Sequence, residues 1–518
     1  MTKQPQPSQS DRNQAAPDKR TVLLIVAALM LVMLLASLSQ TVLSTALPTI
    51  VGALDGADHI MWVITAYLLA STVMMPILGR LSDQFGRKIV LLAAVFVFTA
   101  GSLLGAVAWS MPVLICARVV QGLGGGGLMV LSQAAIADVV PLRERGKYMG
   151  YLAGAFAFSS VVGPLLGGWF TEGPGWRWAF WINVPLGIIS FVVTAFLLHS
   201  PVRAKVKSTQ DYLGMALLAS TTTAVVLVST WGGHQYEWLS PQIIGLAAAA
   251  LLGAVAFVLV ERKATQPIIP MSLFADRNFS VTTIGAIVLG IAMFGSISYM
   301  PTYLQMSMGV SATGAGLMMI SMMGGMLLTV VGTGIVISRT GRYRLYPIAG
   351  SVIMMLGLFL LSTLEVESPR PLVELYLAIF GIGIGCGFQV MTLIVQNSFP
   401  HALVGTATAA NNYFRQVGAT LGSAVVGSIF TTRLLNSLES SLPKAGGSNF
   451  DSNALRPELL DSLPEGVRDV IAQSYNEALM PVFLGLIPLL VISLIALWFV
   501  KETPLAKTLE FSEEQSHR

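Results

Sequence analysis

The 518-residue sequence predicts an all-α integral membrane protein with fourteen membrane-spanning helices. Of its residues 54% are hydrophobic and only 11% are charged, which is roughly half the charge of a soluble domain. The apolar residues also form continuous runs of about twenty, the length that crosses a bilayer as a helix, whereas the strands of a membrane barrel alternate over about ten residues. A β-barrel is therefore excluded.

The positions of the apolar runs and the distribution of basic residues together predict the topology. In order, the spans are expected at residues 21–47, 61–78, 89–108, 112–137, 146–170, 179–199, 212–232, 242–260, 281–304, 313–337, 345–363, 372–395, 405–431 and 480–500. An even number of spans puts both termini on one side. That side receives 22 of the 30 Lys and Arg residues, the opposite side receives 6, and Arg118 and Arg415 fall inside spans. Since cytoplasmic loops are the basic ones, we expect both termini to be cytoplasmic.

Internal similarity between the two ends of the chain predicts two six-helix bundles with two extra helices inserted between them. The loop after span 2 and the loop after span 10 both place basic residues around a glycine, and spans 5 and 13 are both rich in glycine. Repeated halves around a central site are the usual architecture of secondary transporters. The expected parts are a cytoplasmic N-tail (1–20), an N-terminal bundle (21–200), a linker with inserted spans 7 and 8 (201–278), a C-terminal bundle (279–500) with an external loop (432–479), and a cytoplasmic C-tail (501–518). Within that loop, residues 464–479 are expected to form an amphipathic helix lying on the outer surface.

The most informative ten residues are the short loop Gly79-Arg80-Leu81-Ser82-Asp83-Gln84-Phe85-Gly86-Arg87-Lys88. It places three cations, an acid and two glycines between two spans, so it belongs at the lipid surface. There it can bind the ends of neighbouring helices and hold one conformation of a moving protein. We therefore predict a conformational latch made by Gly79, Asp83, Gly86, Arg87 and Lys88.

Two arginines lie inside spans, where a cation costs about 2.5–3.5 kcal/mol on insertion scales and therefore needs a partner or a function. In span 4, Gln121, Gly122 and Gly125 share the helical face of Arg118. In span 13, Arg415 lies in Asn411-Asn412-Tyr413-Phe414-Arg415-Gln416. Arg118 either pins backbone carbonyls or takes part in function. Arg415 either binds an anionic or zwitterionic head group or clamps the fold.

Span 5 ends in Gly163-Pro164-Leu165-Leu166-Gly167-Gly168. Proline removes a helix hydrogen bond and bends the chain. The small residues at 163 and 167 allow another helix to approach closely. Gly163, Pro164, Gly167 and Gly168 are therefore predicted to form a hinge on the outer side.

Taken together, these three stretches resemble the signatures of the major facilitator superfamily. The fourteen spans, the string Trp176-Arg177-Trp178-Ala179-Phe180-Trp181-Ile182-Asn183-Val184-Pro185 and the span 1 segment from Leu38 to Pro48 resemble its fourteen-span drug/proton antiporter branch. The resemblance implies the major facilitator fold and export of amphipathic, often cationic compounds by alternating access, coupled to proton entry. It also implies that Asp83, Arg87 and Lys88 form the latch on the inward side, that Arg118 takes part in proton coupling, and that the span 5 glycines form the antiporter hinge.

One departure from that branch affects the mechanism. Its members usually carry an aspartate in span 1 where this chain has Ser39, and serine does not titrate near neutral pH. The other acids close to the membrane are Asp138, Asp211, Glu261 and Glu374, all expected near helix ends. We take Asp138 as the substitute, so the predicted proton-coupling residues are Arg118, Gln121 and Asp138.

The remaining expectations concern ligands. Polar and aromatic residues predicted to line a substrate cavity are Gln40, Tyr67, Tyr299, Gln389, Asn411 and Arg415. No phosphate-binding loop and no metal-ligand spacing occurs, so no enzyme activity, cofactor or metal is expected. The expected partners are a small amphipathic substrate, protons and membrane lipid, but not nucleic acid. Whether an accessory protein takes part stays open.

Three functions are compatible with these features. The first is a multidrug exporter in the cytoplasmic (inner) membrane of a bacterium. The second is a dedicated exporter of one endogenous lipid, siderophore or antibiotic, favoured by the missing acid at Ser39 and by Arg415. The third is a membrane receptor or scaffold that uses the loop 432–479, in which case Arg118→Ala would be harmless.

Overall fold

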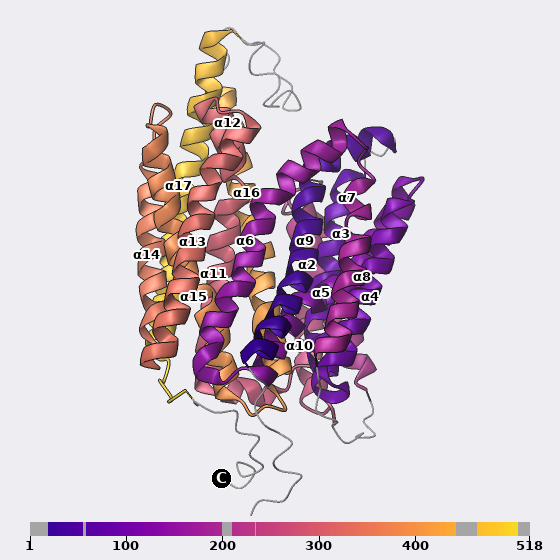
Figure 1. Cartoon of the computed structure of the whole chain (residues 1–518). Helices are drawn as coiled ribbons and strands as arrows, with labels where there is room; N and C mark the ends of the chain where they lie inside the picture. Colours follow the sequence, from indigo (N-terminus) through magenta and orange to yellow (C-terminus); the bar gives the residue numbers. More distant parts are fainter. Residues whose placement is uncertain (1–18, 55–58, 199–209, 234, 442–463, 506–518) are drawn as a thin grey trace, which may run out of the picture.

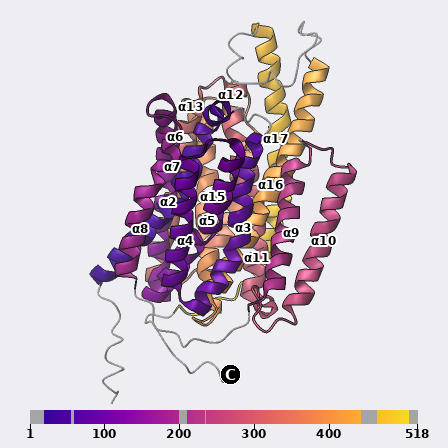
Figure 2. The same cartoon turned by 90° about the vertical axis from the view of Figure 1, so that its right-hand side faces the viewer.

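The computed structural model describes residues 19–54, 59–198, 210–233, 235–441 and 464–505. Within these ranges fourteen helical segments are long and apolar enough to cross a membrane, which confirms the predicted number. Apart from one isolated bridge between Gly232 and Tyr236, the regular structure of the described residues is helical. The helices stand side by side as a single membrane layer (Figures 1 and 2).

The first six spans are those that the sequence assigns to the N-terminal bundle. They are α2 (Lys19–Ala53), α3 (Ile60–Phe85), α4 (Arg87–Ala106), α5 (Met111–Val139), α6 (Leu142–Glu172), and a sixth span made of α7 (Trp178–Trp181) with α8 (Asn183–Leu197). Helix α3 ends and α4 begins at Gly86, whose φ of 92° lies where L-residues with a side chain are strained. Glycine therefore permits the sharp turn between these two spans.

The last six spans are those that the sequence assigns to the C-terminal bundle. They are α11 (Arg277–Ile297) continued by α12 (Met300–Met308), then α13 (Ala312–Thr340), α14 (Leu345–Ser362), α15 (Arg370–Ser398), α16 (Val404–Ser441) and α17 (Glu465–Trp498). The short 3₁₀ helix η2 (Met271–Ala275) precedes this bundle. Its own large apolar core joins Leu289, Met322, Phe380 and Phe483 from four different helices.

The two inserted spans, α9 (Tyr212–Trp231) and α10 (Pro241–Glu261), lie at the side of the molecule (Figure 2). Helix α9 packs against α3 of the N-terminal bundle and α16 of the C-terminal bundle, and α10 packs against α9. The Thr222 and Tyr413 hydroxyl groups lie 2.8 Å apart and join α9 to α16. The insert therefore bridges the two bundles on one flank.

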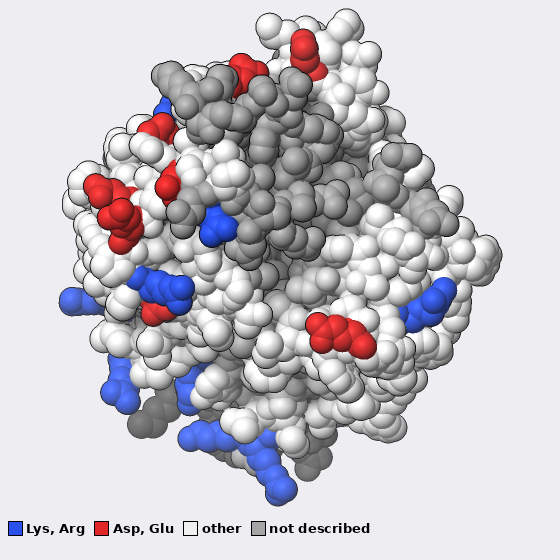
Figure 3. Space-filling model, turned by 90° about the horizontal axis from the view of Figure 1, so that it is seen from above, with Lys and Arg blue, Asp and Glu red and all other residues white. Residues whose placement is uncertain are grey.

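The described chain begins at Lys19 and ends beyond Trp498 on the same side of the molecule, as an even number of spans requires (Figure 1). We call this side the terminal face. Seen from the opposite face, most of the described surface is white, and charged side chains form small separate groups (Figure 3). The structure thus has one face that carries both chain ends and one that does not.

Helices α16 and α17 project beyond the others at the face opposite the chain ends (Figures 1 and 2). With 38 residues, α16 is about 57 Å long, well above the roughly 30 Å of a hydrocarbon core. The structure corrects the sequence at this point: residues 432–441, predicted as part of a loop, are helical, whereas residues 465–479 are helical as expected. The segment 464–479 does not form a separate surface helix, because nearly all of it continues directly into the span α17. Residues 442–463 lie outside the described residues.

Candidate functional site

The two bundles are joined near the terminal face by the carboxylate of Asp83. This buried side chain at the end of α3 accepts hydrogen bonds from the backbone N–H groups of Gly405 (3.2 Å) and Thr406 (2.6 Å). It also accepts one from the Thr406 hydroxyl at 2.8 Å. These N–H groups belong to the first turn of α16, where helix donors lack intrahelical partners and the helix dipole favours an anion. Asp83 therefore caps a helix of the other bundle.

Arg87 completes this contact from the first turn of α4. Its guanidinium lies 3.6 Å from the Asp83 carboxylate and 2.6 Å from the carboxylate of Asp138 at the end of α5. It also donates to the carbonyls of Ala134 and, across the bundle interface at 3.3 Å, of His401. The His401 Nδ1 atom lies 3.3 Å from the Asp138 carboxylate. A buried guanidinium thus holds two carboxylates and the loop before α16 in one cluster.

A second set of contacts crosses the interface close to this cluster. Arg143 of α6 donates from Nε to the Ser338 carbonyl at the end of α13 (2.8 Å). Gln133 of α5 receives hydrogen bonds from Asn412 (3.0 Å) and Gln396 (3.3 Å). The hydrogen bonds between bundles that we have named all lie in the half of the membrane layer next to the terminal face. The structure is therefore closed at that face.

Close backbone approach accompanies these polar contacts. A Cβ atom placed on Gly79 would come 2.2 Å from the Ala409 Cβ, and one placed on Gly334 of α13 would come 2.3 Å from the Gly146 carbonyl oxygen of α6. Glycine at 79 and 334 is what lets α3 meet α16 and α13 meet α6 at this depth. Of the predicted latch, Gly79, Asp83, Gly86 and Arg87 come together here, and Lys88 is half-buried beside them.

Arg118 lies within the N-terminal bundle, 2% exposed. Its Nε donates to the Val63 carbonyl at 3.0 Å, its Nη1 donates to Gln121 Oε1, and its guanidinium stacks 4.1 Å from the centre of the Tyr67 ring. Gln121 in turn donates from Nε2 to the hydroxyls of Ser39 (2.9 Å) and Ser102 (2.8 Å). Among the described residues no carboxylate lies within ion-pair distance of Arg118. The cation is held by neutral groups alone.

Asp138 does not join this group. The sequence predicts that Asp138 acts with Arg118 and Gln121, but in the structure it pairs with Arg87 and His401 in the latch. The other candidate acids also sit at helix ends: Asp211 caps α9 by accepting from Gly214 N (2.8 Å), and Glu261 accepts from the backbone N–H groups of Ile268 and Ile269. Asp211 satisfies an orphan N–H group at the start of its helix, and Glu261 satisfies two backbone N–H groups of the following loop, so both positions have a structural explanation.

Arg415 is the corresponding buried cation of the C-terminal bundle. It donates to Asn412 Oδ1 and stacks 3.9 Å from the centre of the Phe388 ring on α15. One turn away, Asn411 is fully buried and both of its side-chain polar atoms lack a partner, as do Gln389 Oε1 and Thr392 Oγ1. Buried polar groups without partners cost about 1–3 kcal/mol each, so such a cluster usually marks a ligand or water site.

The other predicted cavity residues lie apart from Arg415. Gln40 is exposed on α2 and shares a side-chain hydrogen bond with Tyr67, which is buried beneath Arg118. Tyr299 donates to the Ser423 carbonyl at 2.8 Å, two helical turns from Arg415 toward the opposite face. The structure thus brings Arg415 to the contact between α15 and α16, with Asn411 one turn away on α16 and Gln389 next to Phe388 on α15, and leaves Tyr299 elsewhere.

The predicted hinge is a tight contact between α6 and α2. A Cβ atom on Gly163 or Gly167 would come within 1.9 Å of the hydroxyl oxygens of Thr41 and Thr45, respectively. Pro164 is exposed, and a Cβ on Gly168 would meet nothing within 4 Å. Packing against α2 therefore requires glycine at positions 163 and 167 but not at position 168.

Sequence reasoning missed Thr406, His401 and Gln133, which supply the second side of the interface. Thr406 and His401 are ordinary polar residues near a helix end, which no spacing or composition distinguishes from solvated loop residues. Gln133 lies inside predicted span 4, where a polar side chain signals burial but not its partner. Their positions opposite Asp83, Asp138 and Asn412 arise only when the two bundles meet.

Comparison with known proteins agrees with this geometry. Residues 29–423 match the family model of the Major Facilitator Superfamily. The uncharacterized MFS-type transporter Rv1877 of Mycobacterium tuberculosis (strain ATCC 25618 / H37Rv) is 39% identical over 490 residues, which cover 95% of this chain and 71% of that protein. The multidrug transporter protein MdtP of Bacillus subtilis (strain 168) is 34% identical over 453 residues, covering 87% of this chain and 83% of that protein.

Among solved structures, the human organic anion transporter MFSD10 (TETRAN) superposes with a TM-score of 0.62 at 15% identity, covering 93% of this chain and all of that chain. At that identity the likeness concerns the fold alone. The family match extends over most of the chain, and the relatives extend over nearly all of it. The chain is therefore a membrane transporter that belongs to the Major Facilitator Superfamily.

Proposed function

We propose that this transporter exports amphipathic drugs or toxic compounds across a bacterial cytoplasmic membrane by alternating access, driven by proton entry. In this proposal the terminal face is cytoplasmic, because that face receives most of the Lys and Arg residues. The observation that carries it is the polar closure of the two bundles at that face by Asp83, Arg87 and their partners. A relative named efflux pump FUS6, from Gibberella fujikuroi, supports the direction of transport.

The proposed cycle needs the closure to be reversible. Polar contacts and close glycine contacts join the bundles, and a smaller apolar cluster beside them packs Val73 and Ile77 of α3 together with Ala410 of α16. The two larger apolar cores lie mainly within one bundle each, so the bundles can rotate as units when the latch and this smaller cluster separate. The membrane potential supplies about 2.3 kcal/mol per elementary charge per 100 mV, which corresponds to a gradient of roughly fiftyfold. One or two net charges per cycle therefore suffice for useful export.

Reconstitution in proteoliposomes tests this proposal. The purified chain is inserted, the lumenal pH is followed with a trapped dye, and candidate compounds including ethidium are added. We expect a compound-triggered proton flux that an ionophore abolishes and that Asp83→Asn reduces. Compound movement without any proton flux would contradict proton coupling, and no movement across a broad panel would contradict multidrug export.

A dedicated exporter of one endogenous lipid, siderophore or antibiotic is the second candidate. It is favoured by the buried guanidinium groups of Arg118 and Arg415. Neither has an acidic partner among the described residues, and both would repel a cationic drug. Export of cationic and of anionic compounds by Arg415→Ala separates the candidates. Loss of anion export alone supports the second candidate, whereas equal effects on both classes favour a structural role for Arg415.

A further inference from the structure

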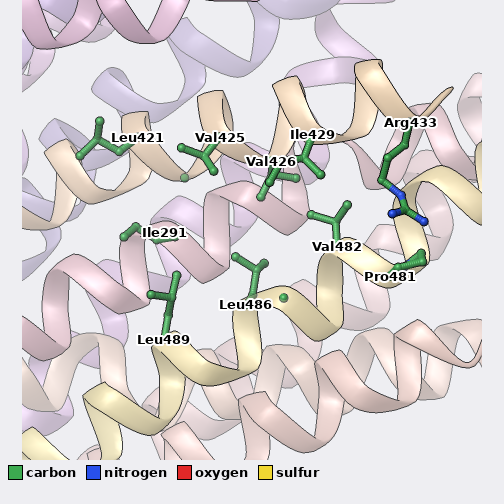
Figure 4. A pocket seen from close by; sticks show the side chains of 12 residues that line it. Ile291, Leu421, Val425, Val426, Ile429, Arg433, Pro481, Val482, Leu486 and Leu489 are labelled. Carbon is green, nitrogen blue, oxygen red and sulfur yellow. The ribbon is translucent and has the colours of Figure 1, made fainter. Parts of the chain in front are cut away.

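A groove runs along the flank of the C-terminal bundle and is lined by residues of α11, α16 and α17 (Figure 4). Its volume is about 280 Å³. Eleven of its twelve lining residues are apolar or glycine, among them Ile291, Val425, Ile429, Val482 and Leu486. The twelfth is Arg433, whose guanidinium lies at one end of the groove (Figure 4). The groove is therefore an apolar slot with one cationic end.

The sequence of α17 explains why the slot is open. Gly485 lies in the wall, and a Cβ atom placed there would meet nothing within 4 Å. Pro481, one turn away, lacks a backbone N–H and interrupts the helix hydrogen bonding. By contrast, a Cβ on Gly422 of α16 would come 2.5 Å from Ile291 of α11. The floor is thus tightly packed between α11 and α16, while α17 leaves space in front of it.

The depth of the groove matches one leaflet of a bilayer. The apolar run predicted as span 13 ends at residue 431, so Arg433 follows directly after the end of that run at the face opposite the chain ends. Leu421 lies about 18 Å deeper than Arg433. The apolar floor therefore lies in the leaflet at the face opposite the chain ends, and Arg433 lies at the level of its phosphate groups.

The Arg433 guanidinium has N–H groups available to bind an anion. It is exposed and donates from Nη2 to the Glu477 carbonyl at 3.2 Å. The Glu477 carboxylate accepts instead from Gln473 (3.1 Å) and Ser437 (3.5 Å), and in the described part of the chain no carboxylate lies within ion-pair distance of Arg433. A guanidinium binds phosphate through several N–H groups at once.

We propose that this groove binds an anionic phospholipid, with one acyl chain on the apolar floor and the phosphate on Arg433. Helix α17 packs on α11, α14 and α16 of its own bundle, so the groove faces away from the interface that alternating access requires. Val425 and Ile429 are 49% and 45% exposed, which leaves the floor open to lipid. The site is independent of the transported compound, and it lies in the outer leaflet in the proposed orientation.

Native mass spectrometry of the full-length protein, titrated with phosphatidylglycerol or phosphatidylcholine of identical chains, tests the assignment. Both head groups offer a phosphate to Arg433, but the choline of phosphatidylcholine adds a fixed positive charge that the guanidinium repels. We therefore expect phosphatidylglycerol to bind several-fold more tightly and Arg433→Gln to remove that preference. Gly485→Leu, at a position where a Cβ meets nothing within 4 Å, and Ile429→Trp on the floor should each fill the slot and weaken binding of both lipids. Arg370→Gln at the same face and Gly245→Leu on α10, where a Cβ also meets nothing, serve as matched controls and bind as wild type does.

Two outcomes would overturn the proposal. If both groove-filling variants bind both lipids as tightly as the controls do, the groove is not the lipid site. If an exported compound displaces phosphatidylglycerol from the wild type one for one, the groove belongs to the substrate pathway. Neither outcome bears on proton-driven export, which is measured separately by the lumenal pH assay.

Discussion

The hydroxyl of Ser39 accepts a hydrogen bond of 2.9 Å from Nε2 of Gln121, whose Oε1 accepts from the buried guanidinium of Arg118. The position at which the antiporter branch usually carries an aspartate is thus joined through one amide to the arginine of span 4. In this chain the connection contains no acid, so the centre of the N-terminal bundle keeps an uncompensated positive charge. Restoring an acid there is the most direct test of how charge at this point sets selectivity.

Ser39→Asp should shift transport toward cationic compounds. Only the Gln121 amide separates a carboxylate at this position from Arg118. The carboxylate therefore neutralises the buried cation and offers a proton site in span 1. We expect several-fold faster ethidium efflux relative to an anionic dye, measured in proteoliposomes. Ser39→Asn is the matched control because it adds a similar volume without charge. Equal efflux ratios for the two variants would show that charge at residue 39 does not set selectivity.

Asp83→Asn should open the terminal face. The amide keeps the size of the side chain but removes the charge that faces Arg87 and the N-terminus of α16. Breaking a buried pair costs about 3–5 kcal/mol, and even a third of that shifts a two-state equilibrium roughly tenfold. Spin labels at Glu144 and Thr340, which are exposed at the ends of α6 and α13, should move apart.

The control for this measurement is Asp276→Asn. Asp276 also caps a helix, accepting from Phe279 N at 2.8 Å, but its contact lies within α11. The label distance should not change in this variant. An unchanged distance in Asp83→Asn as well would mean that the Asp83 carboxylate does not hold the face closed.

Gly334→Ala should disfavour the closed state by sterics alone. The added Cβ would come 2.3 Å from the Gly146 carbonyl oxygen, so α13 and α6 must separate. We expect the label distance between residues 144 and 340 to lengthen, with a wild-type circular dichroism spectrum. Gly332→Ala on the same helix meets nothing within 4 Å and should leave the distance unchanged. Identical distances in both alanine variants would contradict a packing role for Gly334.

Gly163→Ala should impair the predicted hinge. Its Cβ would come 1.9 Å from Thr41 Oγ1, and overpacking of this kind typically costs about 1–3 kcal/mol. We expect a lower unfolding temperature and slower transport, both partly restored by Thr41→Ala, which removes the clashing hydroxyl. Gly168→Ala, with open space around its Cβ, should behave as wild type. If the second substitution rescues stability but not transport, the position acts through more than packing.

The sequence by itself determined the fourteen spans, the placement of both chain ends on the same side, and the ordered motifs that resemble the family. Each depends on the length of an apolar run or on residue types close together in the chain. The burial of Arg118 and Arg415 was also foreseeable, because a cation within a span must turn inward. The boundaries of the two bundles and the roles of the site residues stay predictions.

The tertiary structure alone decided which polar groups meet. Asp83 caps a helix more than three hundred residues away, and Asp138 pairs with Arg87 rather than with Arg118. Nothing local distinguishes Thr406 or His401, because a hydrogen bond between bundles depends on the rotation and depth of both helices. The extension of α16 and α17 beyond the membrane was missed for a related reason: polar helices outside the bilayer are stabilised by packing against each other, which no hydropathy pattern records.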